Sequence, residues 1–139
     1  PDPQDRATFL SSKLHWEKRE QGRENILCRF YRRLIALRKE LVCLKYPDKK
    51  GLVVETPDND RILVLMRRNE ESAVCAVVNF DGVDREVRVR TGMPPGRWRK
   101  LLDSADQTWG GEGATVPDTI EADMPFTIRS HNLVLFMPG

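Results

Sequence analysis

The chain has 139 residues, of which 40% are apolar and 32% are charged, so it is long enough to bury a hydrophobic core and its composition excludes intrinsic disorder. Its 23 basic and 21 acidic residues nearly balance, which gives no reason to expect a polyanionic partner. We therefore expect neither nucleic acid nor a membrane as a partner, since no apolar run approaches the roughly 20 residues that span a bilayer.

The cysteines and histidines predict neither a disulfide framework nor a metal site. Cys28, Cys43 and Cys75 are odd in number and widely spaced, which is typical of reduced thiols and favours a cytoplasmic protein. His15 and His131 lie at no metal-ligand spacing from a cysteine or a carboxylate. We expect no metal and no cofactor.

The first segment, "PDPQDRATFLSSKLHWEKREQG", predicts a loop followed by a helix over residues 6–20 that ends at Gly22. The chain begins without methionine and in loop-like sequence, so we expect something upstream of Pro1 in the natural protein. A second helix is predicted over residues 26–44, and together the two helices are expected to form a hairpin.

The apolar arc of this second helix covers more than half of its circumference at about 100° per residue. An arc this wide predicts packing against two bodies rather than one. Arg38 lies within the arc, where its charge must either reach solvent or meet a carboxylate, and we expect a carboxylate partner. The opposite face, with Arg29, Arg32 and Arg33, is interpreted as solvated, because no base-reading or stacking motif accompanies it.

After "KYPDKKG" the pattern changes to short apolar runs separated by turn residues, which predicts an all-β antiparallel sandwich. The expected strands are "GLVVET", "RILVLMR", "AVCAVVNF", "REVRVR", "RWRKLLDS" and "NLVLFMPG", with a turn at "PDND". The second and third are apolar on both faces and should be central, whereas Val87 and Val89 alternate with charged residues, as in a strand with one solvated face. Residues 108–128 should form a long loop with one short strand at most.

Three stretches carry a resemblance to a known family. "PDPQDRATFLSSKLHWEKRE", "FYRRLIALRKE" and "LLDSADQTWGGEGATVP" are similar to the C-terminal end of the maltooligosyltrehalose trehalohydrolases, a family of the alpha-amylase clan of glycoside hydrolases. The pairing of "PDPQD" with "SKL" favours this family over branching or debranching relatives. Two alternatives stay open: the C-terminal domain of a glycogen branching enzyme, and a non-catalytic β module that binds glucan or a protein.

The resemblance implies that residues 1–46 are the loop and helices that close a catalytic (β/α)8 barrel and that residues 47–139 are the C-terminal β-sandwich domain. It implies an upstream catalytic barrel as partner and an α-glucan, or maltooligosyltrehalose, as substrate of the intact enzyme. Retaining glycosidases need two carboxylates about 5 to 5.5 Å apart, and the family supplies them from earlier barrel strands. We therefore expect no catalytic residue in this segment, and Asp103 and Asp106 are interpreted as structural.

Four residues are candidates for substrate contacts. By resemblance "PDPQD" follows the eighth barrel strand, so Asp2, Gln4 and Asp5 could bind sugar hydroxyls, although Asp5 could instead cap the helix that follows. Trp109, beside loop glycines, is a candidate for sugar stacking, whereas Trp98 is expected in the core. Without an upstream barrel, the chain should either dimerise through its helices or fold them onto its own β domain.

Overall fold

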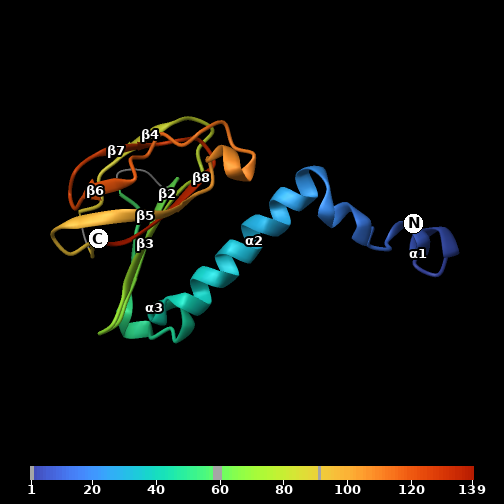
Figure 1. Ribbon diagram of the computed structural model, residues 1–139, viewed down its shortest axis with the longest axis horizontal. Helices are drawn as coiled ribbons and strands as arrows, with labels where there is room; N and C mark the ends of the chain where they lie inside the picture. The colour runs from blue at the N-terminus through green and yellow to red at the C-terminus, as the bar shows by residue number, and fades with distance from the viewer. Residues whose placement is uncertain (1, 58–60, 91) are drawn as a thin grey trace.

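The computed structural model describes residues 2–57, 61–90 and 92–139 (Figure 1). The helical elements are α1 (Arg6–Ser11), η1 (Trp16–Glu20), α2 (Gly22–Glu40), α3 (Val42–Lys45), η2 (Lys49–Gly51) and η3 (Gln107–Trp109). The strands are β1 (Leu52–Glu55), β2 (Ile62–Arg68), β3 (Ala73–Asn79), β4 (Arg85–Val87), β5 (Arg97–Asp103), β6 (Thr119–Glu121), β7 (Phe126–Ile128) and β8 (Asn132–Pro138). All of these helical elements except η3 precede the first strand, as expected.

The strands form two antiparallel sheets. A six-stranded sheet has the order β1-β2-β3-β8-β5-β6, and β4 pairs with β7 in a separate two-stranded sheet. The large sheet is open, with β1 and β6 at its edges, so it does not close into a barrel. The predicted fold class, an antiparallel β domain preceded by helices, is confirmed. The predicted turn at 57–60 falls mainly on residues 58–60, which lie outside the described residues.

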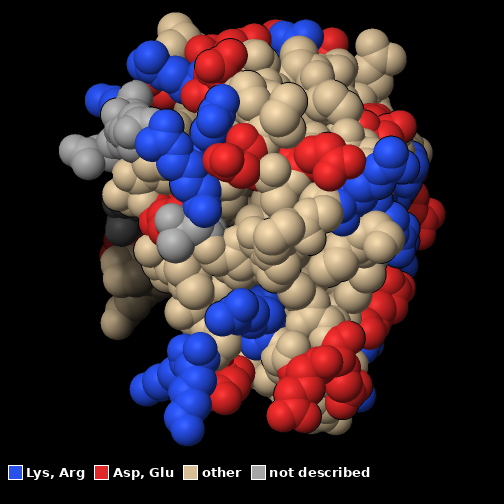
Figure 2. All heavy atoms as spheres, turned by 90° about the vertical axis from the view of Figure 1, so that its left-hand side faces the viewer, with Lys and Arg blue, Asp and Glu red and all other residues tan. Residues whose placement is uncertain are grey.

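The main core lies between the two sheets. Its largest fully buried side chains include Trp98 from β5, Phe136 from β8 and Ile128 from β7. The rings of Phe126 and Phe136 meet edge to face, 5.6 Å apart, and join the small sheet to the large one. Strand β4 buries Val87 and leaves Glu86 exposed, which confirms one solvated face. Figure 2 shows basic and acidic side chains interspersed over one face of this domain.

Strand β3 is central and covered on both faces, as predicted from its unbroken apolar sequence. It lies between β2 and β8. Cys75 and Val77 belong to the core between the sheets, whereas Val74 packs in a second cluster on the opposite face of the large sheet. A strand with helix on one side and sheet on the other has no polar face, which explains the missing alternation.

Helix α2 packs along that opposite face, where the second cluster combines its residues with others from α3 and the large sheet. Leu37 is 2% exposed there, with Phe30 and Leu34 packed beside it. The other side of α2 exposes three apolar residues at helical spacing, Leu27 (54% exposed), Tyr31 (58%) and Ile35 (52%), which we call the outer stripe. The helix therefore covers the β domain with half of its apolar arc. No described helix is both long and apolar enough to cross a membrane.

The hairpin prediction is wrong in its geometry. The single helix expected over residues 6–20 is divided into α1 and η1, and Figure 1 shows α1 beyond η1, away from α2 and the β domain. Phe9 and Trp16 are 60% and 66% exposed, so the described residues leave most of these two apolar side chains uncovered. Because short helices need apolar packing, the segment does not form one continuous helix.

Two further expectations need correction. Arg38 is exposed, and the described residues give it no ion-pair partner, because the guanidinium at the C-terminal end of α2 reaches solvent instead of a carboxylate. Residues 108–128 contain two short strands, β6 and β7, rather than one at most. Three-residue strands carry too little periodicity to be recognised in sequence, and β7 exists because it pairs with β4.

A candidate binding groove between helix and sheet

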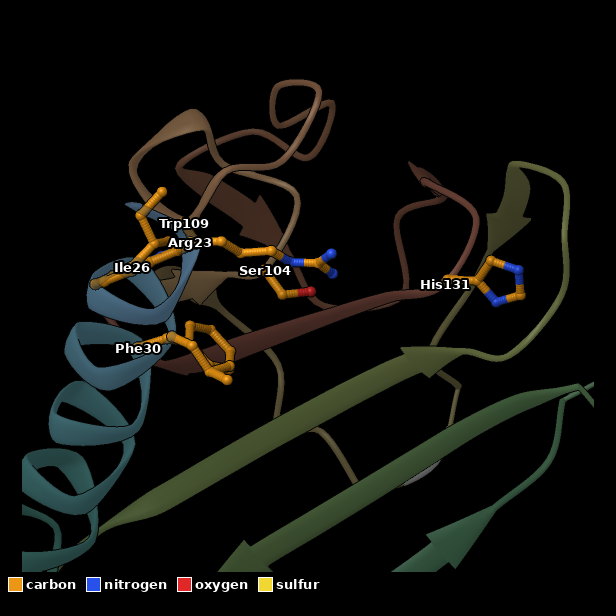
Figure 3. A pocket seen from close by; sticks show the side chains of 7 residues that line it. Arg23, Ile26, Phe30, Ser104, Trp109 and His131 are labelled. Carbon is orange, nitrogen blue, oxygen red and sulfur yellow. The ribbon is translucent and has the colours of Figure 1, made fainter. Parts of the chain in front are cut away.

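A groove of about 440 Å³ lies between the N-terminal half of α2, the turn η3 and the start of β8 (Figure 3). Its lining residues are Arg23, Ile26, Leu27, Phe30, Ser104, Trp109 and His131. The volume is in the range of small-molecule sites. The groove combines residues from three segments that are distant in the sequence.

One wall of the groove is aromatic and aliphatic. The rings of Phe30 and Trp109 meet edge to face, with centroids 5.5 Å apart and planes at 69°. The Arg29 guanidinium lies 6.0 Å from the centre of the Trp109 ring, within cation–π range. Gly110 adopts a left-handed conformation (φ 76°), and a Cβ there would lie 3.6 Å from Ile26. Since 3.6 Å is an ordinary van der Waals distance, glycine is favoured here by the left-handed backbone rather than by a lack of space beside α2.

The other wall is polar. Figure 3 shows Arg23 reaching from α2 toward Ser104, with the imidazole of His131 farther across the groove. The Ser104 hydroxyl donates to Asn132 Oδ1 at 2.7 Å and accepts from the backbone N–H of Leu133 at 2.9 Å. Ser104 is thus fixed by these two hydrogen bonds, whereas Arg23 and His131 are exposed, and His131 Nε2 lies on the side of Gly82, 3.9 Å from where a Cβ would stand there.

A polar network next to the groove includes Ser104 of its lining through Asn132. The Asp103 carboxylate, 3% exposed as a residue, accepts from the backbone N–H of Ala105 and from Asn132 Nδ2, both at 3.0 Å. Lys100 Nζ lies 3.7 Å from Asp103 Oδ2 and 3.2 Å from Asp118 Oδ1. These contacts fix β5, the following turn and β8 relative to one another. Asp103 therefore stabilises the loop, as the sequence indicated.

Asp106 also stabilises the turn that carries Trp109. It is the N-terminal cap of η3, and its carboxylate accepts from the backbone N–H of Thr108 at 2.7 Å. Hydrogen bonds from Thr108 hold the pKa of the Asp106 carboxyl below its ordinary value of 3.8. Capping this turn is the kind of structural role that the sequence predicted for Asp106.

The lining of the groove consists of aliphatic, aromatic, basic and hydroxyl side chains. Its lining residues include no Asp or Glu, whereas glycoside hydrolysis requires two carboxylates about 5 to 5.5 Å apart in retaining enzymes. Among the described residues, no three His, Cys, Asp or Glu side chains are placed to hold a metal ion. What the lining offers is an apolar surface beside hydrogen-bond donors.

The N-terminal candidates lie far from this groove, at the other end of the helical segment (Figure 1). Asp5 Oδ1 accepts from the backbone N–H of Ala7 at 2.9 Å and caps α1, which is the alternative role that the sequence left open. Asp2 Oδ1 accepts from the backbone N–H of Gln4 at 2.9 Å. All three are exposed, and sugar binding by Asp2, Gln4 and Asp5 stays a prediction.

The two tryptophans of the β domain differ as expected. Trp98 is buried in the core and its Nε1–H donates to the Pro94 carbonyl oxygen at 3.0 Å, whereas Trp109 is half-buried and lines the groove. Sequence reasoning did not select Arg23, Phe30 or His131 as site residues. No local motif marks them: Arg23 and Phe30 join the groove through the packing of α2, and His131 joins it from the start of β8.

Comparison with known proteins places the β domain in a family. The model of the alpha amylase C-terminal all-beta domain matches residues 54–137, more than half of the chain. Malto-oligosyltrehalose trehalohydrolase of Mycobacterium tuberculosis is 41% identical over 75 residues, which cover 54% of this chain and 13% of that protein. Malto-oligosyltrehalose trehalohydrolase of Deinococcus radiodurans is 52% identical over 40 residues, which cover 29% of this chain and 7% of that protein.

Solved structures show the same fold at 18% sequence identity. A Salmonella typhimurium protein assigned to the alpha amylases has a TM-score of 0.65, covering 100% of this chain and 20% of that one. Trehalulose synthase MutB of Pseudomonas mesoacidophila has a TM-score of 0.56, covering 78% of this chain and 17% of that one. The chain therefore matches only a small part of longer proteins. Since the family model spans the antiparallel domain described above, the chain belongs to the family of alpha amylase C-terminal all-beta domains.

Proposed function

We propose that the chain is the C-terminal part of a glycoside hydrolase that releases trehalose from maltooligosyltrehalose, and that this segment caps the catalytic domain. The 41% identity to the Mycobacterium tuberculosis trehalohydrolase carries the proposal. The groove has no carboxylate pair, so the chemistry belongs to upstream residues. The cytoplasmic location expected from the cysteines is part of the same proposal.

The outer stripe is the surface that would contact the catalytic domain. Leu27, Tyr31 and Ile35 are each more than half exposed, although all lie on a helix whose opposite side is buried. Phe9 and Trp16, nearer the N-terminus, are also exposed. In the Salmonella typhimurium structure, the region that resembles this whole chain makes up 20% of a longer polypeptide. A large neighbouring domain is thus available to bury such a surface.

The first experiment is an assay of the longer protein that carries this chain. Incubation with maltooligosyltrehalose should release trehalose, measured by chromatography of the products. Transfer of glucan chains to 6-hydroxyls, without trehalose release, would overturn the trehalohydrolase proposal and support the branching-enzyme alternative. An absence of both activities, with glucan or protein binding intact, would support the binding-module alternative.

The capping role has a separate test in the same protein. Replacing both Tyr31 and Ile35 with Glu should lower the thermal unfolding midpoint of the longer protein, because two charges would enter the proposed interface. Arg32→Glu, on the solvated face of the same helix, is the matched control and should have little effect. Equal midpoints for the double variant and the control would contradict the capping role.

A further inference from the structure

Another groove, of about 280 Å³, lies at the C-terminal end of α2 and is lined by Arg38, Leu44, Pro47 and Arg67. We call it the arginine groove. Arg38 belongs to the last turn of α2 and Arg67 to strand β2, so the two arginines come from segments that are distant in the sequence. Met66 points into the core between the sheets, so Arg67, the next residue of the strand, lies on the face that the helices cover.

The guanidinium group of Arg67 is not satisfied by this chain. Its Nη1 is buried and has no hydrogen-bond partner among the described residues, although the group is always charged and carries only donors. Arg38, which is exposed, has no ion-pair partner in the described part of the chain either. A buried donor without an acceptor costs free energy, and two like charges in one groove add repulsion. The arginine groove therefore lacks a negatively charged acceptor.

We infer that the arginine groove binds a carboxylate side chain, Asp or Glu, of the upstream catalytic domain. The inference rests on the proposed function, which supplies that domain. A carboxylate accepts from more than one N–H group at once, so a single side chain between Arg38 and Arg67 satisfies the buried Nη1 and reduces the repulsion between the two arginines. It also gives Arg38 the carboxylate partner that its position in an apolar arc predicts.

The location of the groove favours a protein carboxylate over a free anion. Arg38 follows Tyr31 and Ile35 at helical spacing, so it continues the outer stripe, the surface proposed to contact the catalytic domain. The rest of the lining, Leu44 and Pro47, is apolar. A domain that covers the outer stripe also removes water from this groove, and there a charge-assisted pair fixes how the two domains meet.

The first test is the thermal unfolding of the longer protein that carries this chain. Arg67→Met keeps an unbranched side chain and removes its charge, so the unfolding midpoint should fall by at least about 2 °C, because the partner carboxylate is left buried and unpaired. Arg68→Met, at the exposed next residue of β2, is the matched control and should leave the midpoint unchanged. A guanidinium without a partner predicts the opposite sign, since its replacement by an apolar side chain is neutral or stabilising.

The second test identifies the carboxylate. Arg38→Lys places an amine in the groove, and a water-soluble carbodiimide joins an amine to an adjacent carboxylate as an amide. Peptide mass spectrometry of the treated longer protein should find residue 38 joined to an Asp or Glu of the upstream domain. Arg32→Lys, on the solvated face of the same helix, is the control and should not form a link to that carboxylate.

Each of three results would overturn the inference. The first is equal midpoints for Arg67→Met and Arg68→Met. The second is that residue 38 forms no cross-link, or forms one only within this 139-residue chain. The third is a midpoint of the longer protein that rises with sodium phosphate unless Arg67 is replaced, because the groove then holds a free anion. A longer protein that shows the expected midpoints and cross-link but releases no trehalose would overturn the proposed activity and leave the carboxylate pairing intact.

Discussion

The indole of Trp109 packs edge-on against the phenyl ring of Phe30, 5.5 Å away between ring centres, and this contact joins the turn after β5 to helix α2. Phe30 also belongs to the cluster that α2 forms with the sheet. A single aromatic pair thus contributes both to helix docking and to one wall of the groove. Its removal should affect stability and the shape of the groove together.

Phe30→Ala should lower the free energy of unfolding by about 2 to 3 kcal/mol, because it removes a large half-buried side chain and an aromatic contact. Ile35→Ala removes an exposed apolar side chain from the same helix and should cost less than about 1 kcal/mol. Urea unfolding followed by circular dichroism measures both. Similar losses for the two variants would show that α2 is not docked as the structure describes.

Asn79 should be essential to the loops at one end of the sheets. It is 1% exposed, and its Nδ2 donates to the carbonyl oxygens of Val83 and Arg129, each at 2.9 Å. Asn79→Ala would leave these acceptors unpaired, so we expect a loss of about 2 to 4 kcal/mol in unfolding free energy. Phe80, its exposed neighbour, is the control, and Phe80→Ala should cost less than about 0.5 kcal/mol.

The Cys75 thiol should make stability fall at alkaline pH. Burial raises its pKa from 9.0 to about 12, with a smaller contribution from the Glu55 carboxylate. Above pH 9 the unfolded chain therefore loses this proton while the folded chain keeps it, and stability decreases until about pH 12. Between pH 7 and pH 10 the advantage of wild type over Cys75→Ala should shrink by about 1.4 kcal/mol. Urea unfolding measures this, and a difference in unfolding free energy between wild type and Cys75→Ala that stays constant from pH 7 to pH 10 would contradict the prediction.

Arg85 should control the titration of Asp81. The Arg85 side chain donates Nε–H to Asp81 Oδ2 at 2.8 Å, and this hydrogen bond, with a backbone contribution from Gly82, holds the pKa of Asp81 below 3.8. The stabilisation is present above the ordinary pKa of an aspartate and is lost as pH falls through the lowered value. Arg85→Met should raise the pKa of Asp81 in an NMR titration, whereas Arg88→Gln should leave it unchanged.

The outer stripe should make the isolated chain self-associate. With the longer protein absent, Leu27, Tyr31 and Ile35 remain 54%, 58% and 52% exposed, and burying the rest of their apolar surface against a second copy is favourable. Light scattering should show a mass that rises with concentration for wild type. The double replacement of Tyr31 and Ile35 by Glu should keep the chain monomeric and folded. A wild-type monomer at all concentrations would contradict this expectation.

The sequence by itself determined the β domain and the helices that precede it, because hydrophobic periodicity and turn residues indicate which faces of the helices and strands are buried. The unbroken apolar run of β3 predicted a strand covered on both sides, and Val74 and Val77 lie in the two expected layers. The width of the apolar arc on α2 predicted two partners, of which the sheet is one. Trp98 and Asp106 also have the structural positions that their sequence contexts indicated.

Only the tertiary structure decided how distant segments meet. Residues 6–20 have helical periodicity, but the described residues leave their apolar side chains largely exposed, and they divide into two short elements. Strand β7 is three residues long and exists through its pairing with β4. Arg23, Trp109 and His131 share a groove because α2 docks on the sheet, a long-range contact that leaves no local signal. Local periodicity encodes burial, whereas the choice of which buried faces meet depends on packing across the whole chain.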